Sequence, residues 1–91
     1  MLIVHALITF DLLYVNSLKG RRKVLHAIKD RLKNQNMAVA DLSGEYPKEA
    51  RIALCFFAKG QENANNKIQK LEEQLRHHFP ELEFDIQYEI F

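Results

Sequence analysis

Four stretches of the chain carry the apolar patterns of β-strands. Residues 2–12 alternate with a period of two, and apolar side chains on both faces indicate a central strand. Residues 37–42 predict a short strand, and the continuous apolar run within 51–58 predicts a second central strand. Residues 82–90 alternate between apolar and polar positions, which indicates a strand with one buried and one solvated face.

Two further stretches have the spacing of amphipathic helices. The first helix is expected from about Leu18 to Lys33, with Ser17 as its N-cap and the Asn-containing segment 34–36 at its end. The second helix is expected to be capped by Asn63 or a neighbour, and Pro80 stops it. Both helices show apolar residues at steps of three and four, so each has one face to bury.

The resulting order is β-α-β-β-α-β with short connections, and the brief turn near residues 43–47 predicts a hairpin between the second and third strands. Two right-handed crossovers place both helices on one face of a four-stranded antiparallel sheet. We therefore predict a ferredoxin-like α+β fold, in a single domain over residues 1–91. A hydrophobic fraction of 47% and a charged fraction of 27% are typical of a folded protein.

The first ten residues are apolar enough to suggest a signal peptide, but the details favour a strand. No basic residue precedes the run, Asp11 follows it directly, and no small-residue cleavage site is present. The run is also too short for a membrane-spanning helix. The one cysteine, Cys55, excludes an internal disulfide and fits a reducing cytoplasm, so we expect a cytoplasmic protein without a membrane partner. Because Cys55 lies inside an apolar strand, it is expected to be an inert core residue.

Charge changes this picture, because it is unevenly distributed. The formal net charge is only +1, yet residues 17–34 hold seven basic residues and one acidic residue, Asp30. Residues 81–91 hold four acidic residues and no basic one. The chain is electrically polarised, which points to a surface that attracts anions.

The segment Ser17 to Leu25, SLKGRRKVL, opens a helix after an N-terminal strand and resembles the signature of the YlxP-like proteins (domain of unknown function 503). Three later features follow in the family's order: the pair Arg31-Leu32, the triplet Val39-Ala40-Asp41, and the apolar strand after Arg51. The resemblance implies a ferredoxin-like fold and no assigned activity. The family's genes commonly lie beside translation-initiation and ribosome-maturation genes, which implies an association with RNA or the ribosome.

The chain departs from this family pattern at two places. Gly20 stands where an acidic residue is usual, and the hairpin segment 43–49 is short and lacks the usual Trp. The second departure means that no function of that loop is carried over to this chain.

The start of the first helix is the first candidate site. Free backbone N–H groups and the helix dipole favour an anion there, Gly20 permits close approach, and Ser17 adds a hydroxyl. Basic residues at a helix start oppose the dipole at about 0.3–1 kcal/mol each, which favours a functional reason for them. The alternative is a solvated basic face. The basic residues of this candidate site are Lys19, Arg21, Arg22 and Lys23.

A stripe along the same helix extends this candidate site. Arg22, His26, Lys29 and Lys33 step by four, three and four, so they share one face. Such a stripe can follow a phosphate backbone, although a solvated face has the same pattern.

Other chemistries have weaker signals. RNA recognition through the sheet needs exposed aromatics on the two central strands. Of Phe56 and Phe57 on the third strand, one must face away from the helices, but the Gly-Phe pattern of that mode is absent. Core or dimer-contact aromatics are the alternative. The adjacent His77 and His78 point about 100° apart on a helix, and no other His or Cys lies at ligand spacing, so we expect no metal. The loop YVNSLKGRR has the position of an acylphosphatase anion loop but not its motif. We assign no catalytic residue and no cofactor.

Three functions follow as hypotheses. The first is a non-enzymatic binding module for RNA or a ribosomal particle, acting through the basic first helix. The second is a self-associating module, a homodimer formed through apolar residues on the uncovered face of the sheet. The third is a small phosphate-ester enzyme that uses the loop before the first helix.

Overall fold

The computed structural model describes all residues 1–91. The elements in chain order are β1 (Leu2–Asp11), α1 (Leu18–Lys33), β2 (Ala38–Asp41), β3 (Glu49–Ala58), α2 (Gln61–His78) and β4 (Glu83–Ile90). Their type and order match the prediction, and each strand boundary falls within about two residues of the expected one because alternation marks a strand along its whole length.

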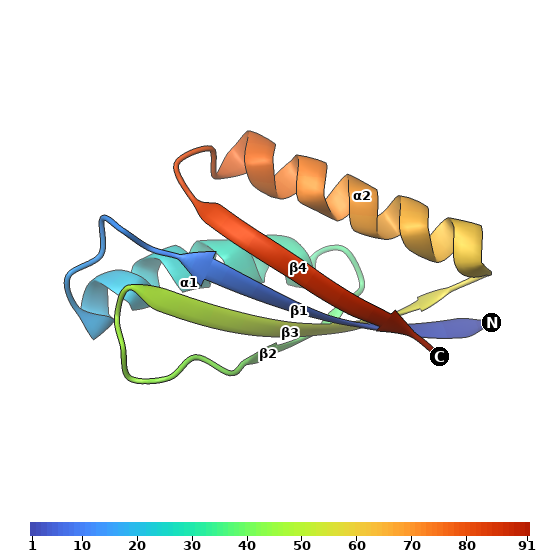
Figure 1. Cartoon of the computed structure of the whole chain (residues 1–91), viewed down its shortest axis with the longest axis horizontal. Coiled ribbons are helices and arrows are strands. Elements are labelled where there is room, and N and C mark those ends of the chain that lie inside the picture. The colour runs from blue at the N-terminus through green and yellow to red at the C-terminus, as the bar shows by residue number, and fades with distance from the viewer.

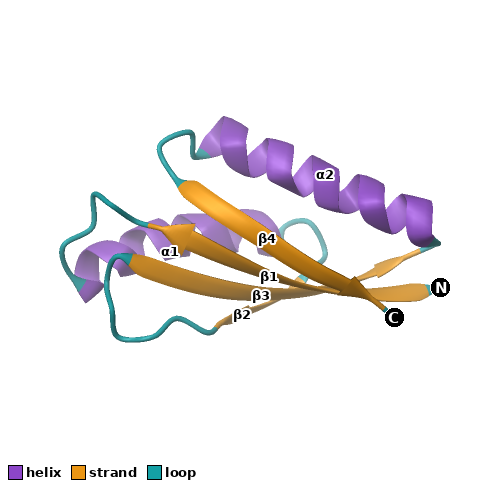
Figure 2. Ribbon diagram, viewed as in Figure 1, coloured by secondary structure: helices purple, strands orange, loops and turns teal.

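The four strands form one antiparallel sheet in the order β2-β3-β1-β4. Both helices lie on the same side of this sheet, and the two chain termini meet at one end (Figure 1). Figure 2 shows the opposite side of the sheet without a covering helix. The ferredoxin-like α+β fold is therefore confirmed, as is the central position of β1 and β3. Neither helix is long and apolar enough to cross a membrane.

The core lies between the sheet and the helices, and the register of the central strands builds it. Val4 is paired with Phe56 and Ile8 with Ile52, so the even-numbered residues of both strands face the helices. The helices contribute their apolar stripes to the same cluster. The buried helical residues are Leu25, Ile28 and Leu32 of α1 and Ala64, Ile68, Leu71 and Leu75 of α2.

The uncovered face of the sheet carries the odd-numbered residues of the same strands. Phe57 is 62% exposed there, whereas Phe56 is buried against the helices. Cys55 pairs with His5 on the uncovered face and is exposed. The expectation that Cys55 is a core residue was wrong. A continuous apolar run does not reveal which of its two faces is covered, and only the register decides it.

The helix termini follow the sequence with one exception. The hydroxyl of Ser17 accepts a hydrogen bond from the Gly20 N–H at 3.1 Å, and Asn36 adopts the left-handed conformation with a φ of 60°. α2 begins earlier than expected, with Gly60 as its N-cap and no side-chain cap. Asn63 lies inside the first turn, where its Oδ1 accepts a hydrogen bond from the Lys59 N–H at 2.9 Å.

Candidate functional site

The outer face of α1 holds a group of exposed basic side chains that nothing in the chain neutralises. Packing of its apolar stripe against the sheet fixes which residues point outward. Four exposed basic residues on this side make no ion pair and no side-chain hydrogen bond. We call these four residues the basic face: Lys19, Arg22, Lys23 and Lys33.

The single acidic residue of α1 is paired with a histidine and not with a residue of the basic face. Asp30 lies 3.2 Å from His26 Nε2, one turn away on the same helix. Both side chains are largely exposed, so the pair contributes little to stability. The pair leaves the four cations of the basic face without a carboxylate partner.

Lys29 belongs to the predicted stripe but faces the edge of the sheet. Its Nζ lies 3.6 Å from the carboxylate of Asp41 on β2. Burial raises the pKa of Asp41, but hydrogen bonds from Ser43 and the charge of Lys29 outweigh this effect, and the pKa lies below its ordinary value. Lys29 therefore joins the helix to the edge strand.

Arg21, at the start of α1, is held by the loop that joins β2 to β3. Its guanidinium donates hydrogen bonds to the carbonyl oxygens of Tyr46 and Glu49, at 2.9 and 3.0 Å. In the same region the Lys48 ammonium donates to the Leu13 carbonyl at 3.0 Å. The shortened hairpin loop is thus fastened to the start of the helix, and Arg21 is the residue that joins them.

The helix start itself is open. Ser17 satisfies the Gly20 N–H, which leaves other N–H groups of the first turn without a side-chain acceptor. A Cβ on Gly20 would meet Ser17 Oγ at 3.4 Å and Val15 Cγ1 at 3.6 Å, which are ordinary contacts. Packing alone therefore does not require a glycine at this position.

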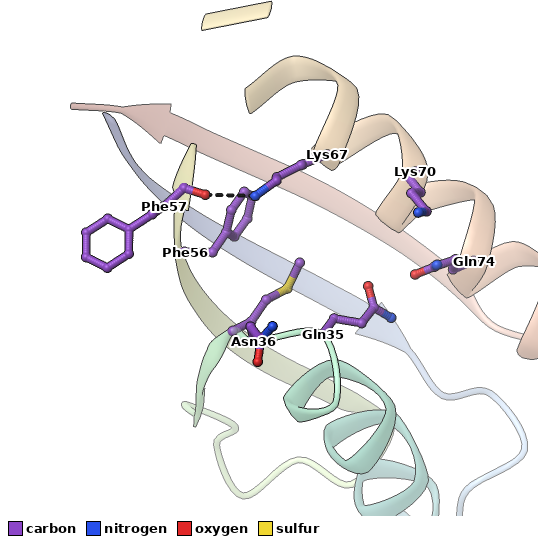
Figure 3. A pocket seen from close by; sticks show the side chains of 8 residues that line it. Gln35, Asn36, Phe56, Phe57, Lys67, Lys70 and Gln74 are labelled. Carbon is purple, nitrogen blue, oxygen red and sulfur yellow. Dashed lines mark hydrogen bonds between the residues drawn. The ribbon is translucent and has the colours of Figure 1, made fainter. Parts of the chain in front are cut away.

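The structure also contains a groove that was not predicted from the sequence. A groove of about 410 Å³ lies between the end of α1 and α2, with Lys67, Lys70 and Gln74 on its α2 wall (Figure 3). The available signal was the step of three and four between these residues, which places them on one flank of the helix beside its apolar stripe. The remaining lining residues are Gln35, Asn36, Met37, Phe56 and Phe57.

A basic residue of α1 lies close enough to α2 to affect a histidine there. Desolvation and the nearby positive charges of Arg31 on α1 and His77 lower the pKa of His78. The rings of His77 and His78 are 4.9 Å apart at 78°. No group of three or more His, Cys, Asp or Glu residues lies close enough to hold a metal ion.

The architecture is similar to that of a solved structure, the de novo designed protein Foldit4. The two share 9% sequence identity with a TM-score of 0.57, over 98% of this chain and 97% of the designed one. At this identity the likeness shows the fold alone. No curated protein matches the chain.

The sequence, unlike the fold, shows which family the chain belongs to. Residues 3–87 match the family described as "Protein of unknown function (DUF503)". The match spans nearly the whole chain, so the protein belongs to this family, and the resemblance drawn from the SLKGRRKVL segment is confirmed.

Proposed function

We propose that this protein is a cytoplasmic, non-enzymatic module that binds RNA, as part of the ribosome or of a particle in translation, through the basic face of α1. The observation that supports this proposal is the lack of partners for Lys19, Arg22, Lys23 and Lys33. Exposed cations that form no ion pair attract a phosphate backbone, and each contact releases counterions.

The remaining predicted residues have supporting roles in this proposal. Arg21 and Lys29 hold the helix to the hairpin loop and to β2, so they fix the direction in which the basic face points. Ser17 and the first-turn N–H groups can add one phosphate contact at the helix start. We do not propose a phosphate-ester enzyme, because the Ser17 hydroxyl caps α1 by accepting a hydrogen bond from the Gly20 N–H and makes no hydrogen bond to a side chain that could act as a general base.

Cosedimentation with ribosomal subunits tests the proposal. Binding is expected at ~50 mM salt, and log affinity should fall with log salt at a slope of roughly −3 if four cations meet phosphates of a single strand. The double variant Arg22→Glu with Lys23→Glu should abolish it. The matched control is Lys59→Glu with Arg76→Glu, which makes the same charge change away from both the basic face and the groove beside α2. Equal loss in both variants, or no binding of the wild type, contradicts the proposal.

A second candidate function, self-association, is favoured by the uncovered face of the sheet. Ile3, Phe57 and Phe91 are 43%, 62% and 67% exposed, and the register places the first two side by side. Contiguous exposed apolar residues commonly mark an interface. Light scattering at ~100 μM tests this. The wild type is expected to be a dimer, and Phe57→Glu is expected to dissociate it. A wild type that is strictly monomeric would exclude self-association.

A further inference from the structure

The groove between α1 and α2 has a cationic wall that the rest of the chain leaves without a counter-charge. Lys67 and Lys70 are both exposed, and neither forms an ion pair. No Asp or Glu is among the residues that line the groove. An anion in the groove would therefore meet two ammonium groups and no opposing carboxylate.

One of these ammonium groups is held in place. Lys67 Nζ donates a hydrogen bond to the carbonyl oxygen of Phe57 at 3.0 Å and lies 5.8 Å from the centre of the Phe56 ring. Figure 3 shows the Phe57 ring pointing away from the groove, so that this residue contributes its carbonyl rather than its side chain. An ammonium has three N–H donors, and the carbonyl uses one of them. The other two remain for a ligand at a fixed position.

Gln74, on the same wall, carries an unmet hydrogen-bond acceptor. Its Oε1 atom is buried and has no partner in the chain. In Figure 3 the amide of Gln74 is directed from α2 toward Gln35 on the opposite wall. A buried acceptor without a donor is costly, and native structures leave few of them. A ligand that carries an N–H or O–H group beside its anionic group would satisfy this atom.

The opposite wall and the floor fit the rest of such a ligand. Gln35 and Asn36 bring further amide groups, and Met37 and Phe56 bring apolar surface. The volume of about 410 Å³ lies in the range of small-molecule sites, which is about 300–1,000 Å³. A planar, hydrogen-bonding ring joined to an anion matches this combination of surfaces.

We propose that the groove between α1 and α2 is a binding site for a nucleoside phosphate. The phosphate lies at Lys67 and Lys70, and the base donates a hydrogen bond to Gln74. The inference rests on the groove alone and not on the basic face. A free mononucleotide and one nucleotide of an RNA strand present the same chemistry, and the experiment separates these two sources.

The test is an NMR titration of the full chain with AMP, adenosine and inorganic phosphate. AMP should shift the backbone amide signals of residues 35–37 and 67–74, and adenosine and phosphate should each bind at least about tenfold more weakly, because each lacks one half of the contacts. Phosphate that binds as tightly as AMP, or no shift at ~5 mM AMP, overturns the proposal.

Two variants identify the contacts. Lys70→Glu should weaken AMP binding about tenfold or more, whereas Lys59→Glu, the same charge change outside both the groove and the basic face, should leave it unchanged. Gln74→Leu should also weaken AMP binding while the unfolding temperature stays equal or rises, because the orphan acceptor has been removed. Equal weakening by Lys59→Glu, or a folded Gln74→Leu protein with unchanged affinity, contradicts the site.

Titration with a hexa-adenylate strand shows whether the groove binds a free nucleotide or one nucleotide of an RNA strand. Tighter binding than AMP, lost in Lys70→Glu, supports the site and assigns it to RNA. Binding no tighter than AMP supports the site and assigns it to free nucleotide. Failure of the ribosome experiment leaves these results standing, since the AMP titration does not involve the basic face.

Discussion

The two helices solve the same packing problem with opposite use of charge. Each buries a stripe of apolar residues against the same side of the sheet, α1 over 16 residues and α2 over 18. α1 carries seven basic residues and one acidic residue, whereas α2 carries three Lys or Arg and three Glu. An amphipathic helix of this fold therefore forms without a charge excess. The excess on α1 is an addition that packing does not demand.

The first turns repeat this contrast. α2 has Glu62 in its first turn, where a negative charge interacts favourably with the helix dipole, and α1 has no acidic residue there and carries Lys19 instead. α1 makes up for this with a side-chain cap from Ser17, which α2 lacks at Gly60. The difference indicates that α1 keeps its cations at some cost in stability.

The largest expected effect comes from the buried leucines of the two helices, and it tests whether the core-facing sides of α1 and α2 contribute equally to stability. Leu32 and Leu75 lie near the ends of α1 and α2, and each is 1% exposed. Leu32→Ala and Leu75→Ala should each lower the free energy of unfolding by about 2–5 kcal/mol, because each leaves a cavity in the shared core. Urea unfolding monitored by circular dichroism measures both. A negligible loss at either position would show that one helix is not packed as described.

The caps come next. Ser17→Ala should cost about 0.5–2 kcal/mol, because the Gly20 N–H loses its acceptor. Gly60→Ser should gain a few tenths of a kcal/mol, roughly, since nothing lies within 4 Å of a Cβ there and the new hydroxyl can cap α2. The same urea experiment measures both, and a neutral Ser17→Ala would contradict the role of this cap.

Exchanging the first-turn charges should shift stability in opposite directions. Lys19→Glu should stabilise the protein by about 0.3–1 kcal/mol and Glu62→Lys should destabilise it by a similar amount. Under the proposed function, Lys19→Glu should also weaken RNA binding, so that stability and binding move apart. A Lys19→Glu protein that is less stable than the wild type would show that Lys19 serves the fold.

The smallest effect concerns the link between α1 and the sheet edge. The pKa of Asp41 is lowered in the folded protein, so the ionised carboxylate stabilises the fold above its ordinary value of 3.8. This contribution is lost as the pH falls from 3.8 through the folded pKa. Asp41→Asn should therefore make stability less dependent on pH in this acidic range, as thermal unfolding at a series of pH values would reveal. An unchanged pH profile would exclude the Asp41 carboxylate, with its Ser43 and Lys29 partners, as its source.

The sequence alone determined the elements, because their signals are local. Period-two and period-three-to-four patterns marked all four strands and both helices, and Ser17 and Pro80 marked helix ends within a turn. The order of these elements, with right-handed crossovers, then left one plausible sheet topology. The basic character of α1 was equally visible, since charge needs only a count.

The tertiary structure alone decided which of these charges are free. Arg21 and Arg22 are neighbours in the sequence, yet one is bound to the loop before β3 and the other is unpartnered. The partners of Arg21 lie more than twenty residues away, so no local pattern could distinguish it from Arg22. The same reason hid the exposure of Cys55 and the groove beside Gln74, because strand register and helix placement are set by contacts between distant segments.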